Sequence, residues 1–169
     1  MFDFDTIIER RNTDSVKYDG VYDEFGCKDI LPMWVADMDF QSPPVVLEAV
    51  RKCAERGIFG YTFRSDEGKE AFREWVKRRY QWEICSGWMS SSPGIVTALA
   101  LSVRALTKPG DKVLIMTPVY PPFYSVVREN GRELVCSPLK CTGGRYVMDW
   151  EDLDANLRNG VRMLILCNS

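Results

Sequence analysis

The sequence predicts an α/β fold with a mainly parallel sheet, and two patterns in its second half carry that prediction. Continuous apolar runs at 113–116 and 163–167, with a further extended segment at 133–136, are typical of strands covered on both faces of a parallel sheet. Segments whose apolar residues recur at helical spacing separate these runs. Because helix and strand alternate, we expect a partial three-layer α/β/α sandwich preceded by an N-terminal arm.

The pattern of residues 1–40 predicts an arm rather than a compact unit. Residues 5–8 carry a short helical pattern, and a polar stretch then leads to an apolar extended segment at 30–36. Ser42 is the expected N-cap of a helix over about 43–56, which opens on two prolines. A second helix is expected to start at 65–67, and its apolar stripe predicts ordinary core packing (Ala71, Phe72, Trp75, Val76, Tyr80).

The remaining elements follow in order along the chain. The helix 93–106 is apolar on nearly every side, as expected for one packed between layers. A turn is expected at 108–111, and a helix runs from 121–122 to a stop at 130–131. Two glycines at 143–144 break a short extended segment, and acidic residues at 149–152 mark the start of another helix. A buried parallel strand normally leads into a covering helix, yet only Asn168 and Ser169 follow the last one. We therefore expect the fold to be incomplete at the C-terminus, as the front part of a longer protein or as a chain covered by a partner.

Composition excludes several classes of function. The 22 Lys and Arg residues nearly balance 24 Asp and Glu residues, so the chain lacks the basic field of a nucleic-acid binder. Histidine is absent, which excludes histidine-dependent triads and histidine-ligated metals. The six cysteines show no C-x-x-C spacing, and we expect free thiols that are mostly buried or inert. The N-terminus carries acid where a signal peptide would carry Lys or Arg, and no apolar run approaches the roughly 18 residues of a membrane span, which predicts a cytoplasmic protein without membrane partners. The balanced charges predict no nucleic-acid partner.

Three loops lie where an open α/β sheet binds its ligands, beyond the carboxyl ends of strands or before a helix: 90–94, 117–121 and 167–169. The first leads into the apolar helix, where free N–H groups and Gly94 make an anion site feasible. Serine capping plus a turn is the alternative. Tyr120 stands between prolines and is either a stacking platform for a planar ligand or a packed loop aromatic.

Two further features leave alternatives open. Tyr61, in the glycine-punctuated segment 57–61, either reaches another subunit or packs locally. Asp37 and Asp39 share one face of an extended segment, and N-capping of the following turn is favoured over a catalytic pair.

Five segments taken together resemble one family, the pyridoxal-phosphate enzymes of the MalY/PatB type (Met1–Asp5, Leu31–Phe40, Gly57–Tyr61, Ser92–Val96, Thr117–Tyr120). These are cystathionine β-lyase-like members of the class I/II aminotransferase superfamily with the fold-type I architecture. The resemblance implies an arm and small-domain segment at 1–42 and the first part of the large cofactor-binding domain at 43–169.

The resemblance also implies roles for individual residues. The backbone around Gly94, Ile95 and Val96 would bind the phosphate of pyridoxal 5′-phosphate, and Tyr120 would stack on its pyridine ring. Tyr61 would reach the phosphate of the neighbouring subunit's cofactor, so a homodimer is implied. Ala36 matches the position whose backbone meets the carboxylate of an amino-acid substrate.

Other parts of the family's site are not matched by this chain. Asn168 would be the first asparagine of an Asn-Pro-x-Asn-Pro type loop, and no lysine here lies in a segment matching the Schiff-base motif. The expected function is therefore the N-terminal portion of a C–S β-lyase. The alternatives are an aminotransferase, a non-catalytic binding or assembly fragment, and a Rossmann-like nucleotide module, which the missing glycine fingerprint disfavours.

Overall fold

The computed structural model describes residues 3–63 and 65–168. Met1, Phe2 and Ser169, which the predictions above include, lie outside this range. The chain forms two compact units, Met1–Arg64 and Ser65–Ser169. The expected division after residue 42 into an arm and a cofactor domain stays a prediction.

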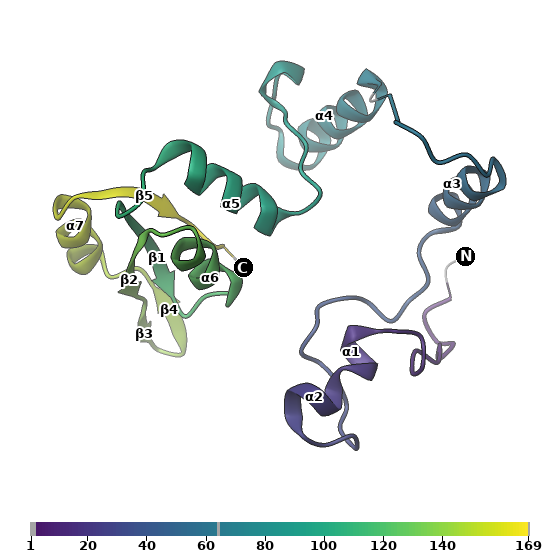
Figure 1. The fold of residues 1–169 in the computed structure, drawn as a ribbon, viewed down its shortest axis with the longest axis horizontal. Helices are drawn as coiled ribbons and strands as arrows, with labels where there is room; N and C mark the ends of the chain where they lie inside the picture. Colours follow the sequence, from purple (N-terminus) through teal and green to yellow (C-terminus); the bar gives the residue numbers. More distant parts are fainter. Residues whose placement is uncertain (1–2, 64, 169) are drawn as a thin grey trace. The chain divides into compact units, whose positions relative to one another are not determined.

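The described residues of the first unit form three helices, α1 (Val16–Asp19), α2 (Val21–Phe25) and α3 (Pro44–Glu55) (Figure 1). The first two fold together around Gly20, so the expectation of an arm without compact structure is wrong for this stretch. The expected helix at 5–8 is also absent, because the Asp3 carboxylate accepts hydrogen bonds from the main-chain N–H groups of Asp5 and Thr6, both at 3.0 Å. Such local side-chain bonds compete with helix formation.

The prolines define the start of α3. Its N-cap is Pro43 rather than the expected Ser42, with no side-chain hydrogen bond at the cap, and Pro44 opens the first turn. Proline suits this position because its fixed φ fits the helix and its missing N–H has no helical partner to lose. The expected helix over 43–56 is otherwise confirmed.

The second unit begins with α4 (Asp66–Tyr80) and the short 3-10 helix η1 (Ser86–Trp88). Core packing of the α4 stripe is confirmed for Val76 alone among its large side chains, since Phe72, Trp75 and Tyr80 are exposed. These rings instead contact one another, with centroids 6.1 Å apart for Phe72 and Trp75 and 5.4 Å apart for Trp75 and Tyr80.

The rest of the second unit is the predicted α/β layer structure. Its elements are α5 (Ile95–Leu106), β1 (Lys112–Thr117), α6 (Pro122–Glu129), β2 (Glu133–Pro138), β3 (Lys140–Thr142), β4 (Arg145–Val147), α7 (Trp150–Arg158) and β5 (Val161–Ile165). Strands β2, β1 and β5 form a parallel sheet in that order, and β3 and β4 form an antiparallel hairpin. The last strand ends at Ile165, two residues before the expected end at Cys167.

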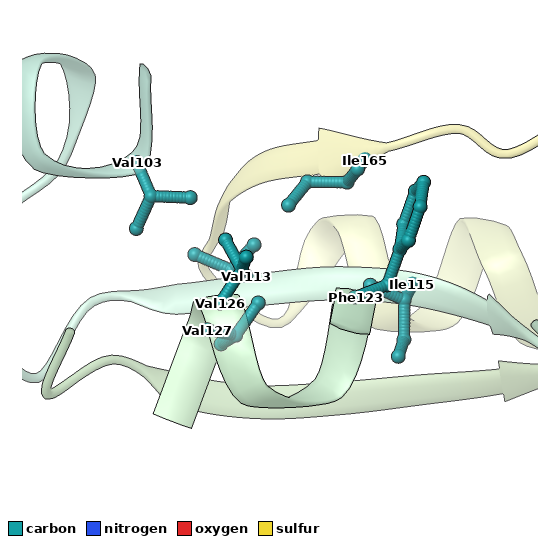
Figure 2. Close-up of a cluster of buried hydrophobic side chains, with 7 residues drawn as sticks. All are labelled: Val103, Val113, Ile115, Phe123, Val126, Val127 and Ile165. Atoms are coloured by element: carbon teal, nitrogen blue, oxygen red, sulfur yellow. The ribbon is translucent and has the colours of Figure 1, made fainter. Parts of the chain in front are cut away.

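Alternate residues of β1 supply the two faces of the sheet. Val113 and Ile115 belong to one core cluster, which Figure 2 shows with Val103 of α5, three side chains of α6 (Phe123, Val126, Val127) and Ile165 of β5. Leu114 and Met116 form a second cluster with Leu153 of α7. Helices thus cover both faces, which confirms the three-layer prediction.

Hydrogen bonds fix the turn between α5 and β1. Arg132 donates from Nε to the Thr107 hydroxyl at 2.9 Å and from Nη2 to the Thr107 carbonyl at 2.7 Å. The N–H of Gly110 donates to the carbonyl of Gly131 at 2.8 Å, and both glycines have positive φ. The loop after α5 and the loop after α6 are therefore joined at the start of the sheet.

Two burial predictions need correction. The cysteines are free, as expected, but all six are exposed rather than mostly buried, because they lie on surfaces that no described element covers. The helix α5 was expected to be covered on nearly all sides, yet Ile95, Leu101 and Leu106 are exposed and Val103 is its one buried residue. Its packing within the described residues is confined to the side that faces the sheet and α6.

Candidate cofactor site

The start of α5 presents an open main-chain surface. Gly94, the N-cap, has extended backbone with φ −174° and ψ 160°, and a Cβ atom placed there would meet nothing within 4 Å. The exposed Ile95 and Val96 begin the helix, and the N–H groups of a first helical turn have no partner inside the helix. A phosphate group can therefore approach these donors closely.

The serine-capping alternative does not describe this helix start. Among the described residues no side chain caps the helix start at Gly94, and the Ser92 hydroxyl instead donates to the Gly94 carbonyl at 3.0 Å. The same carbonyl accepts the first helical hydrogen bond, from Ala98 at 3.0 Å. The donors at the start of α5 thus keep their capacity for a ligand.

The charge at this helix start also suits an anion. Among the described helices of eight residues or more, α4 and α7 carry carboxylates in the first turn, whereas α3 and α6 open on proline. The first turn of α5 has neither. The positive end of the helix dipole is therefore not offset by acidic side chains, and no N–H group is lost to proline.

Tyr120 lies in the same unit, in the loop after β1. Its side chain is 60% exposed, and its ring meets Phe123 of α6 edge-on, with centroids 6.5 Å apart. Its carbonyl accepts the N–H of Phe123 at 3.0 Å, which holds the loop against α6. In Figure 1 the chain enters α5 on the side of the sheet toward which the β5 arrow points. Because Tyr120 follows the end of β1 at Thr117, its exposed side chain lies at the carboxyl edge of the sheet, where ligands of open α/β sheets bind.

The other two predicted site residues belong to the first unit. Tyr61 is fully exposed, in a segment that follows the positive-φ Gly57, and Ala36 is exposed in the extended segment after Trp34. The structure thus brings Gly94, Ile95 and Val96 together and places Tyr120 in their unit. The roles of Tyr61 and Ala36 stay predictions.

Within the described part of the chain, the carboxylates of Asp37 and Asp39 pair with cations and do not cap the following turn, which corrects the expectation for them. Arg10 forms ion pairs with both, at 2.6 Å to Asp39, and Lys17 contacts Asp39 at 2.8 Å. The hydrogen bond from Lys17, followed by that from Arg10, lowers the pKa of Asp39. Hydrogen bonds from Arg10 to Asp37 and then to Asp39 raise the pKa of Arg10. No sequence pattern marks either cation, since Arg10 lies 27 residues before Asp37 and Lys17 lies 22 residues before Asp39.

The described residues lack two further kinds of feature. They contain no cluster of three or more His, Cys, Asp or Glu side chains arranged to hold a metal ion. None of their helices combines the length and the apolar character needed to cross a membrane.

Comparison with known proteins gives consistent matches. The model of the family "Aminotransferase class I and II" matches residues 28–169. Cystathionine beta-lyase PatB from Bacillus subtilis is 45% identical over 166 residues, which is 98% of this chain and 43% of that protein. The chain therefore spans less than half the length of this curated relative.

Solved structures agree over nearly the whole chain. A PLP-bound protein from Clostridium difficile 630 superposes with a TM-score of 0.94 and 42% identity, covering 99% of this chain and 43% of that one. The PLP-bound C-S lyase from Staphylococcus hominis gives a TM-score of 0.88 and 35% identity, covering 97% and 42%. Both units of this chain thus have counterparts in proteins that hold PLP.

Proposed function

The chain belongs to the aminotransferase class I and II family, and from this we propose that it is the N-terminal portion of a pyridoxal-phosphate-dependent C–S β-lyase acting on an amino acid such as cystathionine. The identity to a cystathionine beta-lyase and the likeness to a C-S lyase support the reaction type. Within this chain, the proposal depends on the start of α5, where the space at Gly94 is open and the first turn carries no acidic residue.

The residues present fit the cofactor. The N–H groups of Ile95 and Val96, with the missing side chain at Gly94, would hold the phosphate group, and the Tyr120 ring would lie against the pyridine ring. When bound, the cofactor supplies an electron sink for the carbanion left by loss of the Cα proton. Gly94 and Tyr120 orient it, while the main chain at Ala36 holds the substrate carboxylate. We assign Tyr61 to the phosphate of a second subunit.

Several general properties belong to the same proposal. The protein acts as a homodimer on a small amino-acid substrate, in the cytoplasm, without nucleic-acid or membrane partners. Residues 1–42 form the arm and small-domain segment, and residues 43–169 begin the large cofactor-binding domain. The near-balance of charges supports the absence of nucleic-acid partners, and the exposed Tyr61 supports a contact with a second subunit.

The test is an assay of the full-length protein with PLP and cystathionine. We expect pyruvate and ammonia, together with PLP binding that can be followed by absorbance. A keto acid derived from the whole substrate, without pyruvate, would replace the lyase by an aminotransferase, which the family match also allows. Absence of both PLP binding and turnover would overturn the proposal in favour of a non-catalytic fragment.

A further inference from the structure

Lys17 is a charged residue of α1, and its surroundings are unusual for a lysine. It is only 7% exposed, whereas lysine is almost never buried unless it is paired. Its Nζ donates to the Asp39 carboxylate at 2.8 Å and to the main-chain carbonyl of Asp37 at 3.1 Å. Its charge is therefore satisfied within the chain.

Lys17 also holds the chain on the N-terminal side of Ala36, through its main-chain carbonyl. The indole N–H of Trp34 donates to the main-chain carbonyl of Lys17 at 3.0 Å. Trp34 and Asp37 flank the dipeptide Val35–Ala36, so one residue fixes the chain on both sides of it. The Trp34 ring is held further by an edge-on contact with Phe25, at 5.7 Å between centroids.

Arg10 is the second cation that contacts Asp37 and Asp39. It pairs with the carboxylates of Asp37 and Asp39 and donates to the Met38 carbonyl at 3.4 Å and the Ser15 hydroxyl at 3.2 Å. Two cations thus face two carboxylates, which leaves the network without net charge. Neither cation is left over to bind a substrate anion directly.

Side chains supply the restraint that a strand or helix provides elsewhere. Within the described residues, no hydrogen bond between two main-chain groups involves Trp34–Asp39. The segment keeps its course through the Lys17, Arg10 and Trp34 contacts instead. Loss of one contact would leave the main chain at Ala36 free to shift, and a misplacement of about 1 Å can cost on the order of 100-fold in activity.

We propose that Lys17 is a positioning residue, which fixes the main chain at Ala36 in the place where it meets the carboxylate of the substrate. This inference rests on the proposed function, because Ala36 matters only if an amino-acid carboxylate binds there. Lys17 acts through the main chain and does not touch the substrate.

The experiment compares Lys17→Met with Lys52→Met in the full-length, PLP-loaded protein. Lys52 lies in the same unit, but its side chain is 70% exposed, so its variant controls for loss of a lysine charge. For Lys17→Met we expect the KM for cystathionine to rise about tenfold with kcat within about twofold, because ground-state and transition-state binding are lost equally. The Kd of PLP stays unchanged, and Lys52→Met matches the wild type.

Two milder variants and one binding measurement keep the test decisive if Lys17→Met folds poorly. Lys17→Arg should bring the KM back close to the wild-type value. Trp34→Phe, which removes the indole donor but keeps an aromatic ring beside Phe25, should raise the KM about threefold. The inhibition constant of propionate should rise in parallel with KM in each variant, whereas that of propionamide, which lacks the carboxylate, should not change.

An unchanged KM in Lys17→Met and Trp34→Phe would overturn the inference while the wild-type lyase activity stands. A rise in KM together with a fall in kcat and in PLP affinity would also overturn it, because that pattern indicates a merely structural role. If the wild-type protein neither binds PLP nor turns over cystathionine, the proposed function fails and the inference fails with it.

Discussion

The hydroxyl group of Ser137 in β2 donates a 2.5 Å hydrogen bond to the carboxylate of Asp152 in α7. Ser137 is only 2% exposed, and Asn156 donates to the same carboxylate oxygen at 3.0 Å. This polar contact lies beside the apolar cluster of Leu114, Met116 and Leu153 and joins α7 to the sheet.

Replacing Ser137 by alanine should therefore lower the free energy of unfolding by about 1–2 kcal/mol, since a carboxylate oxygen loses a donor in a half-buried place. Urea denaturation of the full-length protein measures this value. The control is Ser102→Ala, an exposed serine whose hydroxyl bonds within α5, which should change stability by less than about 0.5 kcal/mol. Equal effects of the two variants would contradict the prediction.

Leu114 lies in the central strand and is fully buried. Leu114→Ala should cost about 2–5 kcal/mol of unfolding free energy, because a cavity remains between β1 and α7. Leu106→Ala is the matched control, since the Leu106 side chain is 73% exposed. Thermal unfolding of both variants checks the prediction, and a smaller loss for Leu114→Ala would show that the α7 face is not packed as described.

The ion pair between Lys140 and Asp149, 2.9 Å apart, predicts a pH dependence of stability. The hydrogen bond from Lys140 lowers the pKa of Asp149 below its ordinary value of 3.8. A carboxyl group with a lowered folded pKa stabilises the fold above its unfolded pKa and loses that contribution as the pH falls through the folded value. Stability should thus decline below about pH 4.

Asp149→Asn should flatten this decline, because asparagine keeps an N-cap oxygen for α7 but has no charge to titrate. Unfolding curves between about pH 5 and pH 2 measure the slope. The control is Asp154→Asn, which removes an exposed pair with Arg158 and should leave the slope nearly unchanged. An unaltered slope in Asp149→Asn would refute the assignment.

Tyr120 should affect cofactor affinity through its ring and not through its hydroxyl group. Tyr120→Ala is expected to weaken PLP binding about fivefold, in line with the about 1 kcal/mol typical of aromatic pairs, whereas Tyr120→Phe should stay within twofold. Fluorescence titration with PLP measures both constants. A comparable loss in Tyr120→Phe would assign the contribution to the hydroxyl group instead.

Gly94 offers a test of the phosphate position. Space for a Cβ is open, so Gly94→Ala and Gly94→Asp should both fold with unchanged thermal stability. Gly94→Asp should weaken PLP binding at least tenfold because its carboxylate repels the phosphate, and Gly94→Ala should weaken it less. Binding of pyridoxal, which lacks the phosphate, should not discriminate between the variants. If it does, the phosphate lies elsewhere.

The sheet and its helices could be predicted because their signals are local. The apolar run of β1 and the proline start of α6 each indicate an element without knowledge of the rest. The strand order β2-β1-β5 could not be predicted, since it depends on which strands pair across distant parts of the chain. Residues 5–8 show the limit of periodicity, because one carboxylate at Asp3 supplies a competing set of hydrogen bonds.

The candidate site could likewise be predicted only where its signals are local. The α5 start could be found from Ser92, Pro93 and Gly94, which are neighbours in sequence. The contacts of Asp39 could not, since its cationic partners lie 22 and 29 residues away with no spacing pattern to mark them. Burial of the cysteines and of the α4 aromatics was overestimated, because hydrophobicity alone does not say which element covers a side chain.

The alternation of β1 between two clusters has a consequence for changes in chain length. Val113 and Ile115 serve one helix layer, and Leu114 and Met116 serve the other. Deleting one residue from this strand would exchange the two sets, and neither would fit the layer it then met. At the tip of the β3–β4 hairpin, where Gly143 and Gly144 form the turn, an added residue displaces no buried side chain. Changes in chain length should therefore be tolerated at the hairpin tip, whereas in β1 they should prevent stable folding.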